Sequence, residues 1–309
     1  MLRLTADLNL DSFSADYSGA RNQILVAGSR VPEALVLDRQ SHVHPLAGPG
    51  GESLSCEVTI LGQSRQPNNL LVLVSGTHGV EGFAGSAIQV DCLPLLVEAA
   101  ENNASLGLVI IHAFNPWGFA WLRRGDHEGI DLNRNYLDFS KTLPPNEEYE
   151  SLHQKLMNLE PAKLDNLALL WQESGIDSFT EVFTRGQYRH ADGCFYGGSA
   201  PSWSRQVLER VTADSMFEHA DRIAVIDLHT GLGPYGYGEL INDHLPGTAG
   251  DEWVQRLYGA NAKSAQRGES VSTMKEGLID FYWHQLIEDR GCFVTLEFGT
   301  YSPERLLMS

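Results

Sequence analysis

The sequence has few basic residues, few cysteines and no long apolar run. Its 22 lysines and arginines stand against 40 aspartates and glutamates, which gives a net charge of −18. Nucleic acids and anionic membrane surfaces repel such a chain, so we expect neither as a partner. No run of about 18 apolar residues occurs, and the beginning of the chain lacks a positive cap followed by an apolar segment. We therefore expect neither a membrane span nor secretion.

The cysteines show no spacing pattern that would predict a disulfide framework. Cys56, Cys92, Cys194 and Cys292 are widely spaced and form no CxxC pair, which favours thiols in a reducing compartment. The expected location is therefore the cytoplasm. The chain also lacks a G-x-S-x-G elbow, and no cysteine has the surroundings of an activated thiolate, so a serine or cysteine hydrolase is the weakest hypothesis.

What the chain does contain is an alternation of apolar strands and helices. With 309 residues and 42% hydrophobic side chains, it is long enough for one large α/β core or two modest ones. Buried strands are predicted at 70–76, 106–114, 223–231 and 291–301, and a helix at 84–102. This alternation predicts a largely parallel sheet that is buried on both faces.

The rest of the chain is predicted to join that core. A helix over 11–27, entered through Ser12 or Ser14, and strands at 34–38 and 54–61 form a lead-in, so residues 1–50 are expected to pack on the core. The helical apolar spacing of 144–184 predicts helices that cover the sheet. We therefore predict a single catalytic domain over 1–309.

The loop after the strand at 70–76 offers two metal ligands three positions apart, His78 and Glu81. A third candidate, His229, ends another apolar strand. A catalytic zinc site commonly uses two neutral imidazoles and a carboxylate and leaves a position open for water. Taken singly, each residue is as readily a hydrogen-bonded turn histidine or a solvated carboxylate. Asp227, two residues before His229, is placed to orient that imidazole. With this support, metal binding explains these residues as well as ordinary roles in a turn or at the surface do.

A polar cluster, DLNRN, spans Asp131 to Asn135. A lone DLN is most often a helix N-cap or a loop network. Arg134, however, has the forked geometry that binds a carboxylate, Asn133 can donate to the same group, and Arg124 can stabilise an oxyanion beside a metal. The cluster is therefore a candidate for binding a substrate carboxylate.

Glu297 interrupts a run of strand-forming residues, FVTLEFGTY. A glutamate that is buried in such a strand must be paired, neutral or functional, and exposure at a sheet edge is the alternative explanation. A carboxylate beside a metal-bound water is the usual general base of hydrolysis. We therefore favour a catalytic role for Glu297.

Five motifs in this order, HGVEG, NPWGFAW, RGDHEGIDLNRN, DLHTG and TLEFG, resemble the zinc carboxypeptidase superfamily. That superfamily also includes amidohydrolases of the aspartoacylase and succinylglutamate desuccinylase type. The likeness runs from Tyr17 to Tyr301, and GTHGVEGFAGSAIQ, NPWGFAWLRR and GCFYGG mark one bacterial branch. The resemblance implies an α/β fold with a mixed, mostly parallel sheet of about eight strands flanked by helices.

The resemblance also implies a zinc site. His78, Glu81 and His229 would bind one Zn²⁺ ion, and Glu297 would be the general base. A second ion stays open. The remaining candidates for it are more often satisfied loop or core histidines and are left out of the ligand set; they are His112, His127 and His190.

By the same resemblance, Asn133 and Arg134 hold the terminal carboxylate of the substrate. Arg124 is the carbonyl polariser, with Arg123 as the rival assignment. These roles depend on the family motif and not on spacing alone.

One segment departs from the family. Peptidases of the group carry a tyrosine on a mobile loop upstream of an isoleucine–aspartate pair, and GESVSTMKEGLID has no tyrosine before Ile279. Tyr196 in GCFYGG is our candidate for that role, with Tyr235 and Tyr237 as rivals. An aromatic residue in such a loop is more often a packing residue.

Together these residues predict a zinc-dependent hydrolase that cleaves an amide bond next to a free carboxylate, most simply a metallocarboxypeptidase-like peptidase. An N-acyl amino acid deacylase needs the same residues. A non-catalytic metal- or ligand-binding member of the fold is a third hypothesis, which Glu297 disfavours. The expected partner is a small molecule or peptide with a free carboxylate, and the sequence predicts no oligomeric state.

Overall fold

The computed structural model describes residues 9–158, 176–231, 233–270 and 275–301. The chain forms two compact units, each with its own strands and helices. The first comprises Met1–Arg124 with Arg210–His229, and the second comprises Gly125–Glu209 with Thr230–Ser309.

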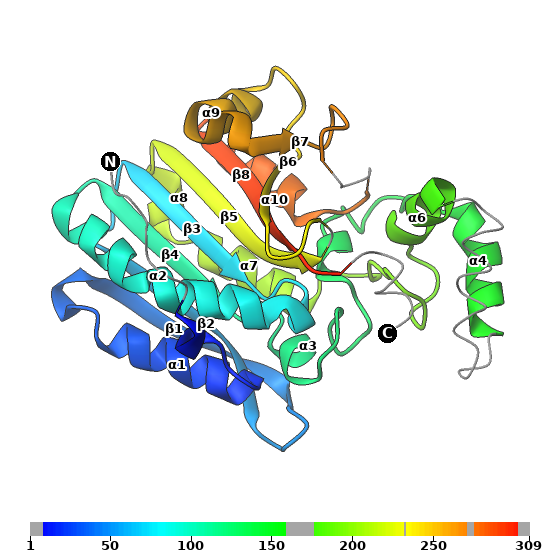
Figure 1. Cartoon of the computed structure of the whole chain (residues 1–309), viewed down its shortest axis with the longest axis horizontal. Helices are drawn as coiled ribbons and strands as arrows, with labels where there is room; N and C mark the ends of the chain where they lie inside the picture. The colour runs from blue at the N-terminus through cyan, green and yellow to red at the C-terminus, as the bar shows by residue number, and fades with distance from the viewer. Residues whose placement is uncertain (1–8, 159–175, 232, 271–274, 302–309) are drawn as a thin grey trace. The chain divides into compact units, whose positions relative to one another are not determined.

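The first unit has strands flanked by helices (Figure 1). Its strands are β1 (Val36–Ala47), β2 (Ser53–Gly62), β3 (Asn69–Ser75), β4 (Leu106–His112) and β5 (Arg222–Gly231, whose last two residues belong to the second unit). Its helices are α1 (Tyr17–Ser29), α2 (Gly82–Asn102), α3 (Pro116–Ala120) and α8 (Ser215–His219), with short 3₁₀ turns η1 (Leu10–Ser12), η2 (Glu33–Leu35) and η3 (Gly79–Glu81).

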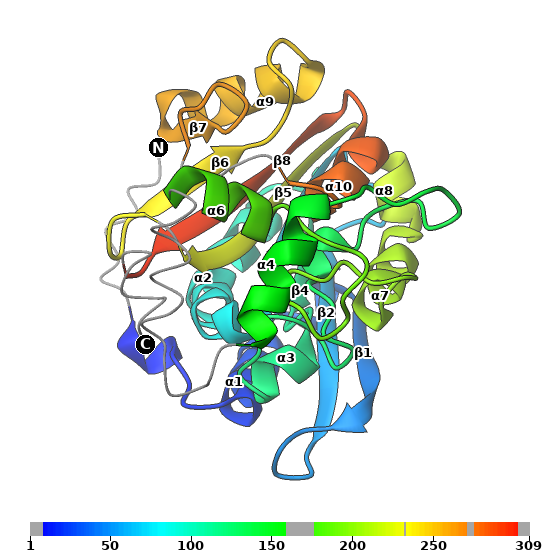
Figure 2. The same cartoon turned by 90° about the vertical axis from the view of Figure 1, so that its right-hand side faces the viewer.

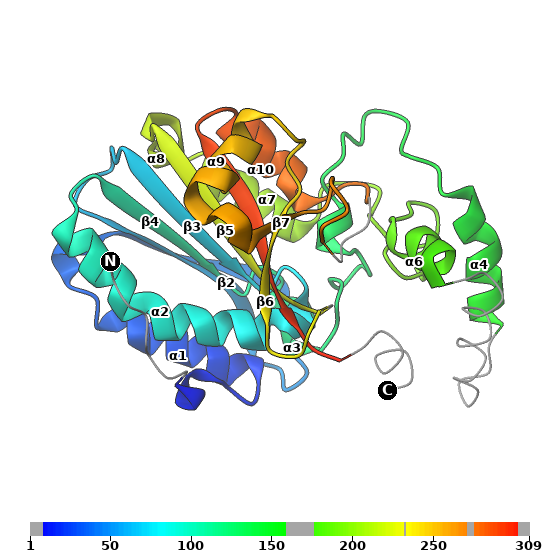
Figure 3. The same cartoon turned by 45° about the horizontal axis from the view of Figure 1, so that its top comes forward.

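The strand order in this unit is β1-β2-β4-β3-β5. β2 is antiparallel to β1 and β4, whereas β3 runs parallel to β4 and β5. Helices α1 and α2 lie side by side in Figures 1 and 3 and pack against each other. Parallel pairing in the middle of the unit therefore places the carboxyl ends of β3, β4 and β5 at one edge.

Helix α1 starts later than predicted. Asp16, and neither Ser12 nor Ser14, is its N-cap, and its side chain accepts a hydrogen bond from the amide of Gly19 at 2.7 Å. Residues 10–12 form the separate 3₁₀ turn η1. A carboxylate that caps free helical amides is as favourable as a serine, and the expected start at residue 11 was too early because α1 begins at Tyr17.

Helix α2 belongs to the apolar core of this unit. With the turn before it, Gly79–Asn102, it is the one helix of the described chain whose length and composition would suffice to cross a membrane, at a mean hydropathy of 1.3. Its Leu93 and Ala100 are buried in a cluster with Leu108 and Ile110 of β4. Such packing is what a core helix requires.

The second unit has a smaller set of strands. They are β6 (Gly238–Asn242), β7 (Ala262–Ser264) and β8 (Gly291–Gly299), in the order β8-β6-β7. β6 is antiparallel to β8 and parallel to β7. Its helices and 3₁₀ turns are η4 (Leu132–Arg134), α4 (Glu147–Met157), α6 (Ile176–Thr184), α9 (Ala249–Tyr258), η5 (Gly259–Asn261) and α10 (Ile279–Ile287); α7 (Trp203–Thr212) runs across the boundary along the chain.

Helices α4 and α6 pack on each other through Tyr149, Leu152 and Phe179, as Figure 2 shows for their ribbons. Residues 144–184 were predicted to cover the sheet with their apolar faces. In the structure, the apolar faces of α4 and α6 are instead buried against each other. Residues 159–175 of that prediction lie outside the described chain.

The described strands make an eight-stranded mixed sheet in an α/β fold, as predicted. The strands predicted at 70–76, 106–114, 223–231 and 291–301 correspond to β3, β4, β5 and β8. The prediction of one catalytic domain over 1–309 stays a prediction.

Candidate metal centre

The pairing of β3 with β5 brings two distant histidines together. The strands are parallel, and Ser75 of β3 is the partner of Leu228 of β5. His229 is the next residue of β5, and His78 lies in the turn that follows β3. Because parallel strands end at the same edge, two imidazoles 151 positions apart in the chain become neighbours.

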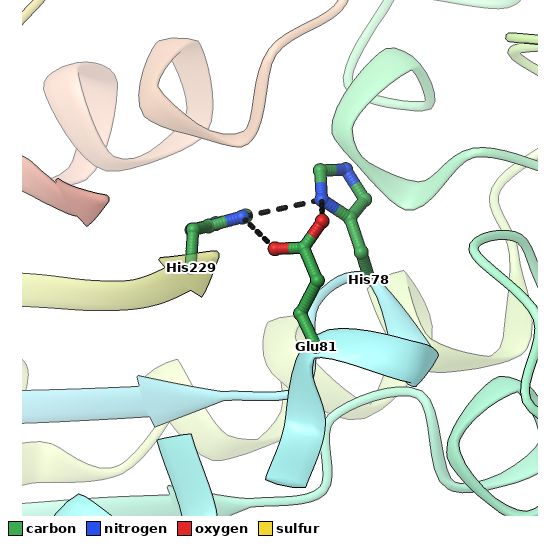
Figure 4. Close-up of side chains that lie close together, drawn as sticks. All are labelled: His78, Glu81 and His229. Carbon is green, nitrogen blue, oxygen red and sulfur yellow. Dashed lines mark hydrogen bonds and ion pairs between the residues drawn. The ribbon is translucent and has the colours of Figure 1, made fainter. Parts of the chain in front are cut away.

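The two histidines and Glu81 point their donor atoms at one place (Figure 4). His78 Nδ1 lies 2.9 Å from one carboxylate oxygen of Glu81, and His229 Nδ1 lies 3.1 Å from the other. The two Nδ1 atoms are 3.2 Å apart, and none of the three side chains is more than 10% exposed. Ligands bound to tetrahedral zinc at about 2.0–2.1 Å are about 3.3 Å apart, so both the donor types and their spacing fit one zinc ion.

The close contacts in this cluster shift the pKa values of Glu81 and His229 in opposite directions. Burial raises the pKa of the Glu81 carboxyl, but His78 and His229 outweigh burial and hold that pKa below its ordinary value. Burial likewise lowers the pKa of His229, but the carboxylates of Asp227 and Glu81 outweigh it and hold that pKa well above its ordinary value. A metal ion that binds here would displace protons from the cluster.

Asp227 orients the second imidazole, as its position in the sequence predicts. Its Oδ2 lies 2.8 Å from His229 Nε2, and its side chain is fully buried. Residues two apart on a strand share a face, which is why this contact forms. A proton on Nε2 leaves Nδ1 with a lone pair for a metal.

Thr77 is a further residue that contacts the cluster through Asp227, and the sequence did not indicate it. Its hydroxyl donates to both carboxylate oxygens of Asp227, at 2.9 and 3.0 Å. This contact joins the turn after β3 to β5 and depends on the strand register. No motif within either segment signals it.

Two glycines of HGVEG allow the turn that carries His78 and Glu81 to pack closely on α3. A Cβ atom on Gly79 would lie 2.1 Å from the carbonyl carbon of Gly118, and one on Gly82 would lie 2.5 Å from the ring of Phe119. This close approach links the motifs HGVEG and NPWGFAW physically. It holds the turn that carries His78 and Glu81.

Of the rival arginines, the structure brings Arg124 to the cluster. Its Nη1 lies 3.5 Å from Glu81 Oε1, whereas the side chain of Arg123 is exposed. The backbone carbonyls of both arginines accept hydrogen bonds from the amides of Gly79 and Val80. The arginine turn therefore supports the metal-binding turn, and the role of Arg124 as carbonyl polariser stays a prediction.

In the second unit, the side chain of Arg134 is buried and donates hydrogen bonds to a backbone carbonyl. Its side chain is 1% exposed, its Nε and Nη2 donate to the carbonyl of Thr184 at 3.0 and 2.6 Å, and its guanidinium lies 5.4 Å from the centre of the Phe195 ring. Asn133 Oδ1 accepts a hydrogen bond from the amide of Ile279 at 2.9 Å. Carboxylate binding by Asn133 and Arg134 stays a prediction, and it requires Arg134 to exchange a carbonyl for a carboxylate.

Glu297 lies on β8 opposite Glu239 of β6 and is only partly buried. Its carboxylate lies against Gly231, since a Cβ there would be 2.5 Å from Glu297 Oε1. The assignment of Glu297 as general base stays a prediction.

The candidate tyrosines lie in different surroundings. The backbone of Tyr196 bridges to Ile130, and its carbonyl accepts from the amide of Asp131, so it borders the DLNRN segment. Tyr235 and Tyr237 are 78% and 54% exposed. The choice of Tyr196 as a substrate-binding residue stays a prediction.

His112 is a core histidine, as expected. It is 1% exposed and hydrogen bonded to the hydroxyl of Ser86 at 2.8 Å, and burial lowers its pKa to about 3. A histidine of this kind stays neutral and serves packing.

Comparisons with known proteins address the fold and the family. The model of a family described as "Protein of unknown function (DUF2817)" matches residues 13–308. No curated protein sequence matches the chain.

Solved structures match at low identity. Carboxypeptidase A from Helicoverpa armigera has a TM-score of 0.52 at 12% identity, with 96% of this chain and 68% of that chain covered. Bovine thrombin-activatable fibrinolysis inhibitor, solved with tick carboxypeptidase inhibitor, has a TM-score of 0.51 at 12% identity, with 94% and 87% covered. A succinylglutamate desuccinylase from Chromobacterium violaceum has a TM-score of 0.42 at 16% identity, with 94% and 68% covered. The chain thus has the fold of carboxypeptidase A, and it belongs to the family described as protein of unknown function DUF2817.

Proposed function

We propose that this protein is a zinc-dependent hydrolase that cleaves an amide bond next to a free carboxylate, as a metallocarboxypeptidase does. The observation that carries the proposal is the buried cluster of His78, Glu81 and His229, whose donor atoms lie 2.9–3.2 Å apart. The carboxypeptidase fold and the ordered family motifs support it.

In this proposal the chain supplies four functions around the scissile bond. His78, Glu81 and His229 hold the metal, and Asp227 keeps His229 in the tautomer that can bind it. Bound zinc would lower the pKa of a water molecule and polarise the substrate carbonyl. Glu297 would serve as the general base for water and return its proton to the leaving amine, and Arg124 would donate to the carbonyl oxygen.

The substrate in this proposal carries a free carboxylate, which Asn133 and Arg134 bind. Tyr196 is a further substrate-binding residue in this proposal. Arg134 donates to the carbonyl of Thr184, so binding requires its guanidinium to exchange that carbonyl for the substrate carboxylate. A small peptide and an N-acyl amino acid both satisfy these requirements, so both belong in the assay.

Three of the four thiols are poorly suited to act as a nucleophile instead. Burial raises the pKa of Cys56, raises that of Cys92 to about 11 and raises that of Cys292 to about 12. Such thiols stay protonated at neutral pH and make poor nucleophiles. We also propose a cytoplasmic location, on the wide spacing of the cysteines.

The test is a panel of C-terminally varied peptides and N-acyl amino acids, assayed with zinc-loaded protein and with protein treated with a chelator. We expect release of the free amine, loss of activity in chelator and recovery on addition of Zn²⁺. Zinc-loaded protein that turns over no member of the panel would contradict the proposal and favour a binding protein.

Glu297→Gln tests the general base. This substitution removes the proton acceptor but keeps the side-chain shape, so the rate should fall by about 10²–10⁴-fold while bound zinc is unchanged. Glu239→Gln is the matched control, because Glu239 is the cross-strand neighbour of Glu297 on β6, and its rate should stay near that of the unsubstituted protein. Full activity of Glu297→Gln would remove this residue as the base.

A further inference from the structure

A second group of histidines and carboxylates lies in the second unit, and the proposed mechanism does not use it. His153, His190 and Asp192 have potential ligand atoms that all lie within 4.8 Å of one another. Glu150 adds a second carboxylate, because its Oε2 is 2.9 Å from His190 Nε2. The four side chains bring together two imidazoles and two carboxylates, which is a donor set that zinc accepts.

Helix α4 supplies one half of this group. Glu150 and His153 are three positions apart on α4, so their side chains lie on the same face of the helix. His153 is 9% exposed at its side chain, and its ring stacks on that of His190 with centroids 3.9 Å apart. The helix therefore presents a carboxylate and an imidazole together.

The loop at 187–194 supplies the other half, and buried Gln187 shapes it. The Gln187 side-chain oxygen accepts from the amides of Arg189 and His190 at 3.0 and 2.8 Å, and its Nε2 donates to the carbonyl of His190 at 2.6 Å. Gln187 is 2% exposed. These bonds determine where His190 and, two residues later, Asp192 leave the backbone.

A glycine lets this loop lie directly against the helix. A Cβ atom on Gly193 would lie 2.8 Å from Tyr149 Oη and 3.0 Å from His153 Nδ1. Tyr149 Oη also donates to the carbonyl of Cys194 at 2.8 Å. The helix and the loop are thus in direct contact beside His153.

The distances suit a bound ion. His190 Nε2 is 2.9 Å from Glu150 and His153 Nε2 is 3.5 Å from Asp192 Oδ1, values that lie on either side of the about 3.3 Å expected between ligands of tetrahedral zinc. A metal lies in the plane of each imidazole it binds, so one ring must turn out of the stack. His190, at 22% side-chain exposure, is the more exposed ring, and Asp192, at 64%, opens the group to solvent.

We propose that His153, His190 and Asp192, with Glu150, form a second binding site for a divalent transition metal, zinc by its donor set, which ties α4 to the loop at 187–194. The site is structural, because it joins two segments of the chain. The same loop carries Tyr188, whose hydroxyl donates to the backbone carbonyl of Arg134 at 2.8 Å. An ion in this site therefore stiffens the loop that contacts the DLNRN segment.

The test counts zinc ions. Protein stripped with a chelator is dialysed against micromolar ZnCl₂, and bound zinc per chain is measured by mass spectrometry. We expect two ions in the unsubstituted protein and one in His190→Ala, in Asp192→Asn and in His229→Ala. We expect none in the double variant His190→Ala/His229→Ala. His219→Ala, a change of an exposed histidine on α8, is the matched control and should keep two.

One outcome would overturn the proposal: a zinc count that both His190→Ala and Asp192→Asn leave equal to that of the unsubstituted protein, whether that count is one or two. Folding is checked by melting temperature, and Asp192→Asn, an exposed and shape-preserving change, covers the case in which His190→Ala does not fold. In the His229→Ala background, zinc should raise the melting temperature, and the added His190→Ala should abolish that rise. The measurement does not depend on turnover, so it is independent of the proposed hydrolase activity.

Discussion

The two histidine–carboxylate groups of this protein differ in how they are built. His78, Glu81 and His229 lie at the ends of two parallel strands and are at most 10% exposed, whereas Asp192 of the second group is 64% exposed. Burial in the first group strengthens every charge interaction and excludes competing water, which suits the activation of one water molecule. The second group joins α4 to the loop at 187–194, which suits a structural ion.

In the first group, further buried side chains hold one of the histidines in place. Asp227 is fully buried behind His229 and is itself held by Thr77. In the second group the carboxylates contact the imidazoles from the solvent side. The two groups are therefore expected to differ in zinc affinity and in their effect on activity.

The largest expected effect is that of His229→Ala. Loss of one of three buried ligands should empty the first group and lower kcat/KM by at least about 10³-fold, because the metal polarises both water and carbonyl. Zinc content and kcat/KM measure it. His190→Ala is the comparison and should stay within about twofold in kcat/KM; an equal loss in both variants would contradict the distinction between the groups.

A smaller effect is expected from Asp227→Asn, which keeps the shape of the side chain but removes its charge. The zinc affinity of the first group should fall by about 10–100-fold, because the carboxylate raises the basicity of His229 and holds its tautomer. Competition with a chromogenic chelator measures this affinity. Asp192→Asn should leave this affinity unchanged, and an unaltered affinity in Asp227→Asn would show that the buried carboxylate does not tune the metal.

The smallest effect concerns Asp126, a buried carboxylate that contrasts with Glu81. Burial raises the pKa of Asp126 to about 6, only partly offset by the amides of Ile130 and Glu128, whereas histidines lower the pKa of Glu81. A carboxyl whose folded pKa exceeds its unfolded value favours the folded state when protonated. Stability should therefore fall as pH rises from about 4 to about 6 and stay lower above that range.

Asp126→Asn should remove this pH dependence and raise the free energy of unfolding at pH 7 by at most ~3 kcal/mol. The amide oxygen keeps the acceptor for the two backbone amides. Urea unfolding at pH 4.5 and pH 7, about the limits of the titration, measures the difference. A variant that is less stable than the unsubstituted protein at pH 7 would show that Asp126 is stabilising as a carboxylate.

Local patterns predicted the strands and the first metal group. Continuous apolar runs marked β3, β4, β5 and β8, because a strand that is buried on both faces must be apolar along its length. His78 and His229 were identifiable since each directly follows or ends such a run. Asp227 was identifiable for the same reason, because residues two apart on a strand share a face.

Helix boundaries and helix packing were less predictable. Ser12, Ser14 and Asp16 are all suitable N-caps, and only the folded chain selects Asp16 for α1. Likewise, the apolar stripes of α4 and α6 show that each helix buries one face but not what covers it.

The amino-acid sequence alone determined the apolar strands β2, β3, β4, β5 and β8, and it indicated that two imidazoles and a carboxylate stand at the ends of β3 and β5, whereas it did not predict β6 or β7. The tertiary structure decided which distant residues meet. Strand register placed Thr77 against Asp227, and helix-to-loop packing placed His153 beside His190. Burial follows from local composition, whereas a contact between distant residues depends on pairing and packing that no single segment encodes.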